Sequence, residues 1–223
     1  MIRLVGHVDA VRRIVTTGAD RFDRGVRAQL LREAHYLRGK MVTGMAAQAP
    51  GGAAFAPLSP LTLAARKFQG FSGTKALIRT GGLRGGINVV HVPGSSGIGG
   101  AVFIGVHRNA RAEDGKSLAN LADIHEFGRS WTMAFTPKMR RYLFAMLKES
   151  GAGGGPATRG ADGRFARGKY AGPRNNSNGM IAITIPARPF VRPTIDEHGK
   201  PEDVRKRFVY GLSKYMGGDF GTP

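Results

Sequence analysis

The feature of this sequence that most constrains its fold is a run of apolar residues spaced three and four apart near the N-terminus. The run consists of Phe22, Val26, Leu30, Ala34, Leu37 and Met41. Because this spacing returns each side chain to the same face of an α-helix, it predicts an amphipathic helix of about six turns. Thr17 or Asp20 is its expected N-cap, and Gly44 is its expected end.

Weaker patterns on both sides of this helix complete the expected fold. Ile2, Leu4 and Val8 indicate a short strand or extended arm, and a weak helical segment follows it. Further strands are expected at 87–92, 101–106, 130–135 and 180–185, and further helices at 61–68, 117–127, 137–150 and 201–216. The first two of these strands are expected to form a hairpin. The pattern predicts one α+β domain over residues 1–223, with a small antiparallel β-sheet flanked by the long N-terminal helix and further helices.

Composition limits the class of protein. The chain holds 34 glycines and 12 prolines, which predicts long loops rich in these residues. It has no cysteine, so disulfides, thiolate zinc sites and thiol nucleophiles are excluded, as suits a reducing cytoplasm. No apolar run approaches the roughly 18–20 residues of a membrane span. The first fifteen residues carry scattered charges and do not resemble a secretory signal.

The strongest compositional signal is positive charge. Thirty-four Lys and Arg residues stand against fifteen Asp and Glu, a formal net charge of +19. Such a surface attracts polyanions or acidic protein faces. The cations are spread along the chain, which argues against a dedicated recognition helix.

One segment concentrates this charge among glycines. Residues 151–179 include nine glycines and a single acid, Asp162. We expect a flexible insertion that meets an anionic partner, either DNA or, as the favoured alternative, an acidic face of a neighbouring protein. Its candidate contact residues are Arg159, Arg164, Arg167, Lys169 and Arg174. A short tail at 217–223 closes the chain.

Motifs for catalysis are absent from the sequence. The stretch ARAEDGKSL at 110–118 resembles a phosphate-binding loop, but Ala110 stands where that loop needs glycine, and Glu113 and Asp114 would repel phosphate. His125 and Glu126 lack the second histidine of a zinc-protease helix. We therefore expect no enzyme activity, no cofactor and no metal site.

Four short motifs suggest architecture instead. They are APLSPLTLAARK at 56–67, LIRTGGLRGGI at 77–87, IHEFG at 124–128 and IPARPFVRP at 185–193. In the second motif, Thr80 can cap a helical turn and two glycines allow a tight backbone. In IHEFG, Ile124 and Phe127 are expected to face the core, and Gly128 to take a left-handed, helix-ending conformation. The alternative places His125 and Glu126 at a subunit boundary.

The last motif raises a similar pair of alternatives. Its prolines end the preceding strand and hold the segment extended at low entropic cost. Phe190 then either fills its own domain or anchors a neighbouring subunit, while Arg188 and Arg192 are placed to meet carboxylates or phosphates. The candidate subunit or ring interface therefore consists of His125, Glu126, Phe127, Arg188, Phe190 and Arg192.

Taken in order, the four motifs resemble the virion-morphogenesis, or tail-completion, family of tailed bacteriophages, including its Mu-like branch. The resemblance spans about residues 1 to 215. It implies a structural virion protein that forms a ring, of six copies, at the neck or tail end. Such a ring completes the tail and joins it to the head, beside neck, connector and tail-tube proteins. Double-stranded DNA passes through its channel.

The same resemblance implies a location in the virion, with the host cytoplasm as the place of assembly. Two other functions stay open from the sequence. One is a free basic DNA- or RNA-binding protein. The other is a capsid-associated assembly factor that is absent from the mature particle.

Overall fold

The computed structural model describes residues 8–92, 100–149 and 179–217. The expected arm at Ile2 and Leu4, all five cations of the insertion, and the tail beyond Gly217 lie outside the described residues. The elements are α1 Val8–Ala47, η1 Pro50–Gly52, α2 Pro60–Phe68, α3 Gly82–Gly85, β1 Ile87–Val92, β2 Ala101–Val106, α4 Leu118–Phe127, β3 Arg129–Ala134, α5 Pro137–Glu149, β4 Met180–Ile185, α6 Arg192–His198 and α7 Pro201–Met216.

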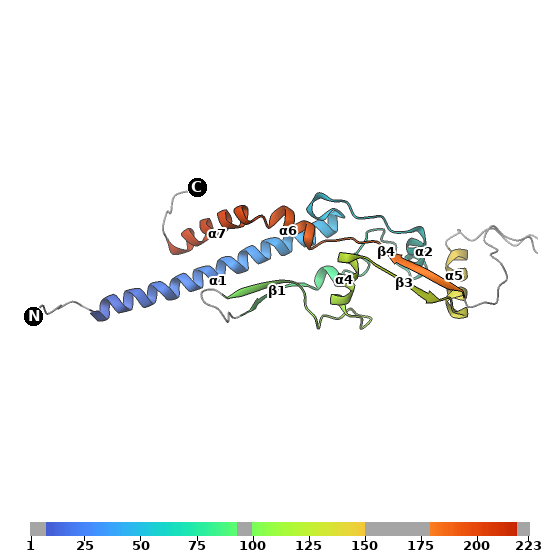
Figure 1. Cartoon of the computed structure of the whole chain (residues 1–223), viewed down its shortest axis with the longest axis horizontal. Helices are drawn as coiled ribbons and strands as arrows, with labels where there is room; N and C mark the ends of the chain where they lie inside the picture. The colour runs from blue at the N-terminus through green and yellow to red at the C-terminus, as the bar shows by residue number, and fades with distance from the viewer. Residues whose placement is uncertain (1–7, 93–99, 150–178, 218–223) are drawn as a thin grey trace, which may run out of the picture.

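The long helix α1 dominates the molecule, and α6 and α7 lie along it (Figure 1). Its boundaries differ from those expected. The helix includes Val8 and runs unbroken past Thr17 and Asp20, so neither residue is its N-cap. It also continues beyond Gly44 and ends at Ala47, before Gln48 turns the backbone to a positive φ of 62°. A single glycine is tolerated within a helix that packing stabilises, and Gly44 lies against Pro50, which explains the later end. Residues 15–22 are all exposed, so packing does not explain the earlier start.

The helix α7 packs on the middle of α1. Tyr215 and Leu212 approach α1 at Gly25, where an added Cβ would lie 2.8 Å from the Tyr215 ring. Gly25 therefore admits a neighbouring helix. Farther along, the Arg207 guanidinium donates two hydrogen bonds to the Glu33 carboxylate, one of them 2.9 Å long. This paired contact raises the pKa of Arg207, chiefly through the hydrogen bond to Glu33.

The strands confirm the α+β class and its antiparallel pairing. β1 pairs with β2, with Ile87 opposite Val106, which confirms the expected hairpin partners. β3 pairs with β4, with Arg129 opposite Ile185. The four strands form two separate two-stranded sheets instead of one small sheet. In β3 only Met133 is even partly buried, whereas Ile181, Ile183 and Ile185 of β4 are, so the packing of this second sheet is confined to one face.

The apolar core lies at the C-terminal end of α1. Met41 and Met45 of α1 pack there with Leu83, Ile87 and Phe190. The segments that supply these residues come from α3, β1 and the chain after β4, so the core joins parts of the chain that are far apart in sequence (Figure 1). No helix within the described ranges has the length and apolarity needed to cross a membrane.

Candidate functional site

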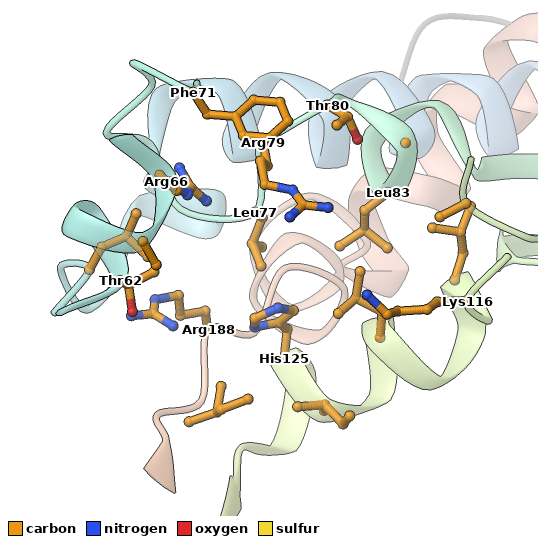
Figure 2. A pocket seen from close by; sticks show the side chains of 18 of the residues that line it. Thr62, Arg66, Phe71, Leu77, Arg79, Thr80, Leu83, Lys116, His125 and Arg188 are labelled. Atoms are coloured by element: carbon orange, nitrogen blue, oxygen red, sulfur yellow. The ribbon is translucent and has the colours of Figure 1, made fainter. Parts of the chain in front are cut away.

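All four motifs of the sequence line one cleft of about 1050 Å³ (Figure 2). Residues from 56–67, 77–87, 124–128 and 185–193 contribute to its wall, together with part of the connection at 112–121. The labelled side chains of Arg66, Arg79, Arg188 and His125 surround the same space. Segments separated by up to about 130 residues therefore build a single site.

The first motif supplies one wall through α2. Ser59 is the N-cap, since its hydroxyl oxygen accepts a hydrogen bond of 3.2 Å from the Thr62 N–H, and Pro60 follows at the first helical position. In the last turn, the Arg66 guanidinium donates to the carbonyl oxygens of Gly73 and Lys75, at 2.9 and 2.7 Å. Arg66 thus fixes the chain that leaves α2, and it is only 9% exposed.

Glu126, at the end of α4, holds the fourth motif. Its carboxylate accepts three backbone N–H groups: those of Phe190 and Val191 at 2.9 and 3.1 Å, and that of Arg192 at 2.9 Å. The neighbouring carbonyl oxygen of His125 accepts from the Arg188 N–H at 2.6 Å. Because Pro186 ends β4, these donors have no strand partner, and the end of α4 satisfies them instead.

Arg188 and Phe190 are both buried but have different surroundings. The Arg188 guanidinium donates to the carbonyl oxygens of Ala56 and Pro57, at 2.7 and 2.9 Å, and the residue is 5% exposed. Phe190 is 1% exposed and belongs to the core. Of the two alternatives left open for Phe190, the structure shows packing within its own chain.

Two candidate residues lie on the surface instead. Phe127 is 76% exposed, so the expectation that it faces the core is wrong. Because α4 turns His125 and Glu126 towards the fourth motif, the next residue along the helix faces away from it. Arg192 is exposed, with the Asp196 carboxylate 3.9 Å from its Nε. Ile124 is half-buried in the cleft wall, as expected of an inward-facing residue.

Gly128 ends α4 with a positive φ of 73° as expected, but its ψ of 164° is extended and not left-handed helical. An added Cβ would lie 2.9 Å from the backbone nitrogen of Ala187. Only glycine adopts this backbone readily and also lets the two segments approach.

Replacing Gly128 with alanine is expected to lower the free energy of unfolding by about 2–3 kcal/mol, since the new Cβ is strained and meets backbone. Urea denaturation measures this loss. Gly85→Ala is the matched control, because no atom lies within 4 Å of its added Cβ. A loss of equal size in both variants would contradict the role of Gly128.

Positive groups in the cleft act on one another. Burial lowers the pKa of Arg66, and the charges of Arg79 and Arg188 lower it further. The pKa of His125 falls to about 4, first through burial and then through the charge of Arg188. The Nδ1 atom of His125 is buried and has no hydrogen-bond partner among the described residues. At neutral pH the ring is therefore neutral, and it lies beside the Arg188 guanidinium, which pairs with no carboxylate in the described part of the chain.

This shift predicts a pH dependence of stability. Between about pH 6.5 and pH 4 the unfolded chain binds a proton at His125 and the folded chain does not. Stability should therefore decrease as the pH falls through this window and should level off below it. We expect His125→Gln to remove this part of the dependence in urea titrations. A nuclear magnetic resonance titration midpoint of His125 near 6.5 would contradict the expectation.

Sequence reasoning did not single out Arg66 or Arg79, although both lie within motifs that it quoted. Their place in one cleft depends on contacts between distant segments, and no local pattern signals such contacts. The connection at 110–118 also differs from a phosphate loop. There the Lys116 ammonium donates to the Asp114 carboxylate at 2.7 Å.

Comparison of this chain with known proteins finds no relative. No protein-family model, no curated protein and no solved structure matches this chain. The described residues hold no group of three or more His, Cys, Asp or Glu side chains placed to bind a metal ion.

Proposed function

We propose that this chain is a structural virion protein of a tailed bacteriophage, located at the neck or tail end. It forms a ring, of six copies as the resemblance implies, that completes the tail and joins it to the head around the DNA channel. One observation carries the proposal. The four motifs that follow the family's order in the sequence also meet in space around one cleft, as the parts of a shared structural unit would.

Exposed apolar side chains support assembly into a larger particle. Among the described residues, nine apolar residues are buried, whereas seventeen large ones are exposed. Phe127 and Phe144 are 76% and 60% exposed. Within the described ranges, each sheet has two strands, so each strand keeps one unpaired edge. Two-stranded sheets are only marginally stable alone, and contact with neighbouring subunits would cover both the edges and the apolar side chains.

The excess of positive charge fits the same setting. A net charge of +19 favours contact with DNA in a channel or with acidic faces of adjoining rings. The charge also favours one rival function, that of a free basic DNA- or RNA-binding protein. Oligomeric state separates the two, since the rival function requires no ring.

The test is the mass of the purified full-length chain at increasing concentration, by mass photometry and electron microscopy. We expect ring-shaped particles of six times the 23.8 kDa chain mass. Labelled chain in imaged particles should then lie between head and tail. A chain that stays monomeric and binds duplex DNA tightly would overturn the proposal in favour of the DNA-binding function. Label found only in immature capsids would favour an assembly factor.

A further inference from the structure

We propose that the cleft lined by the four motifs binds an acidic, partly apolar peptide segment of another protein, with a carboxylate of that segment held by Arg66, Arg79 and Arg188. The site belongs to one chain, so it stands whether or not the chain forms a ring. It assigns a binding role to residues whose contacts within the chain leave donors unused.

The first observation is positive charge without compensation. Among the described residues, no carboxylate forms an ion pair with Arg66 or Arg188, although both are more than nine-tenths buried. In the same part of the chain, Arg79 forms one ion pair, with Asp114 at 3.9 Å, and donates a hydrogen bond of 3.2 Å to the Gln69 side chain. Buried charges in proteins are normally paired, because an unpaired one loses its hydration without an ionic partner. An anion in the cleft would supply that partner.

The second observation is the set of donors still available. Arg66 makes both of its hydrogen bonds through Nη1, and Arg188 uses Nε and Nη2. A guanidinium carries five N–H donors, so each has some left over. The buried Nδ1 of His125 lies in the same site, and no described residue forms a hydrogen bond with it. The carbonyl contacts therefore hold the guanidinium groups in place and leave part of each free for a ligand.

The lining of the cleft decides the class of ligand. Leucine and isoleucine side chains make up much of its wall, including Leu77, Leu83 and Ile124. Glu113 and Asp114 lie in the wall as well, so the positive charge of the cleft is confined to the place where Arg66, Arg79 and Arg188 meet. This local charge suits a single carboxylate better than the closely spaced phosphates of nucleic acid. Arg66 and Arg188, at 9% and 5% exposure, are too deep for a duplex backbone to reach. A peptide that combines apolar side chains with a carboxylate matches both kinds of lining.

The ligand comes from a different protein because this chain is poor in carboxylates. It holds only fifteen Asp and Glu among 223 residues, against thirty-four cations. A second copy can therefore offer few carboxylates to the cleft, whereas an acidic partner offers many and is attracted over a distance. The test must therefore distinguish binding of an acidic partner from binding of a second copy.

The test uses a defined probe, a fluorescein-labelled capped peptide of alternating leucine and glutamate, with the leucine–glutamine peptide as its match. Fluorescence anisotropy should show at least about tenfold tighter binding of the glutamate peptide to the full-length chain. Arg79→Gln should weaken this binding about tenfold. Arg84→Gln, which removes the same charge from an exposed residue outside the cleft, should leave it within about twofold. Melting temperatures check that both variants fold.

Several outcomes would overturn the proposal. One is equal affinity for the two peptides, and another is equal weakening by Arg79→Gln and Arg84→Gln. If inorganic phosphate or a short DNA duplex displaces the peptide at lower concentration than a free glutamate peptide does, the ligand is a phosphate and not a carboxylate. Self-association that the peptide blocks would point to a second copy. A bound carboxylate should also raise the pKa of His125 from about 4 in a magnetic resonance titration, and no rise would place the peptide elsewhere.

Discussion

Replacing Phe190 with alanine is expected to lower the free energy of unfolding by about 3–5 kcal/mol. The side chain is 1% exposed and packs with Met41, Met45, Leu83 and Ile87. Its removal leaves a cavity at the place where α1, α3, β1 and the fourth motif meet. Because this is the apolar cluster that joins those elements, little other packing can compensate for the loss.

Urea denaturation of the monomeric chain at low concentration measures this effect. Phe127→Ala is the matched control, since it makes the same chemical change at a side chain that is 76% exposed. We expect its monomer stability to change by no more than about 0.5 kcal/mol. Mass photometry then separates packing within the chain from contact with a neighbouring subunit. Phe127→Ala should weaken assembly if that side chain meets a neighbour. A Phe190→Ala variant that melts normally but fails to assemble would contradict the assignment of Phe190 to its own core.

The helix and strands that the sequence predicted correctly are those with a clear local pattern. The spacing of apolar residues located α1 and the strands β1, β2 and β4, because helix and strand periods are set by nearby backbone geometry. The ends of α1 could not be predicted. Gly44 has a favourable role at a helix end, yet the packing of Pro50 and of the core around it outweighs that preference. Asp20 lies in an exposed stretch of the helix, and its capping preference did not reveal that the helix begins at Val8.

The candidate site shows more clearly what local sequence patterns cannot predict. Sequence reasoning selected His125, Glu126, Arg188 and Phe190, and the structure brings all four together. The sequence-based prediction gave each of these residues a candidate role at a subunit interface. The hydrogen bonds between Glu126 and the segment at 190–192 join residues that are 64 to 66 positions apart. The sequence around Glu126 and around 190–192 gives no sign that the two segments meet. A carboxylate that binds backbone leaves no pattern of residue types, because every N–H is alike.

Local patterns also do not predict which way a side chain faces on a short helix. In α4 the apolar residues Leu118, Leu121, Ile124 and Phe127 all repeat at a step of three. That step drifts around the helix, since a turn takes 3.6 residues. The run therefore begins with the buried Leu118 and ends with the exposed Phe127. Phe127 could not be placed without knowing which segment covers α4.

The contact between Glu126 and the fourth motif gives the second large expected effect. Replacing Glu126 with alanine should lower the free energy of unfolding by about 2–4 kcal/mol. The carboxylate accepts three backbone N–H groups, and the donors of Phe190 and Val191 are partly buried. Without the carboxylate these donors lose an ionic acceptor, and water reaches them poorly. The loss should also release the segment that carries Arg188 and Phe190, and so disturb the cleft.

Two further variants separate this contact from the general cost of removing a charge. Asp123→Ala removes an exposed carboxylate from the same helix and should change stability by no more than about 0.5 kcal/mol. Glu126→Gln keeps the shape and one acceptor oxygen, so its loss should fall between those of the two alanine variants. Urea titrations followed by circular dichroism and by the fluorescence of Trp131, the single tryptophan, measure all three. Equal stability of the Asp123→Ala and Glu126→Ala variants would mean that the fourth motif keeps its place without Glu126, and the cleft would then need another support.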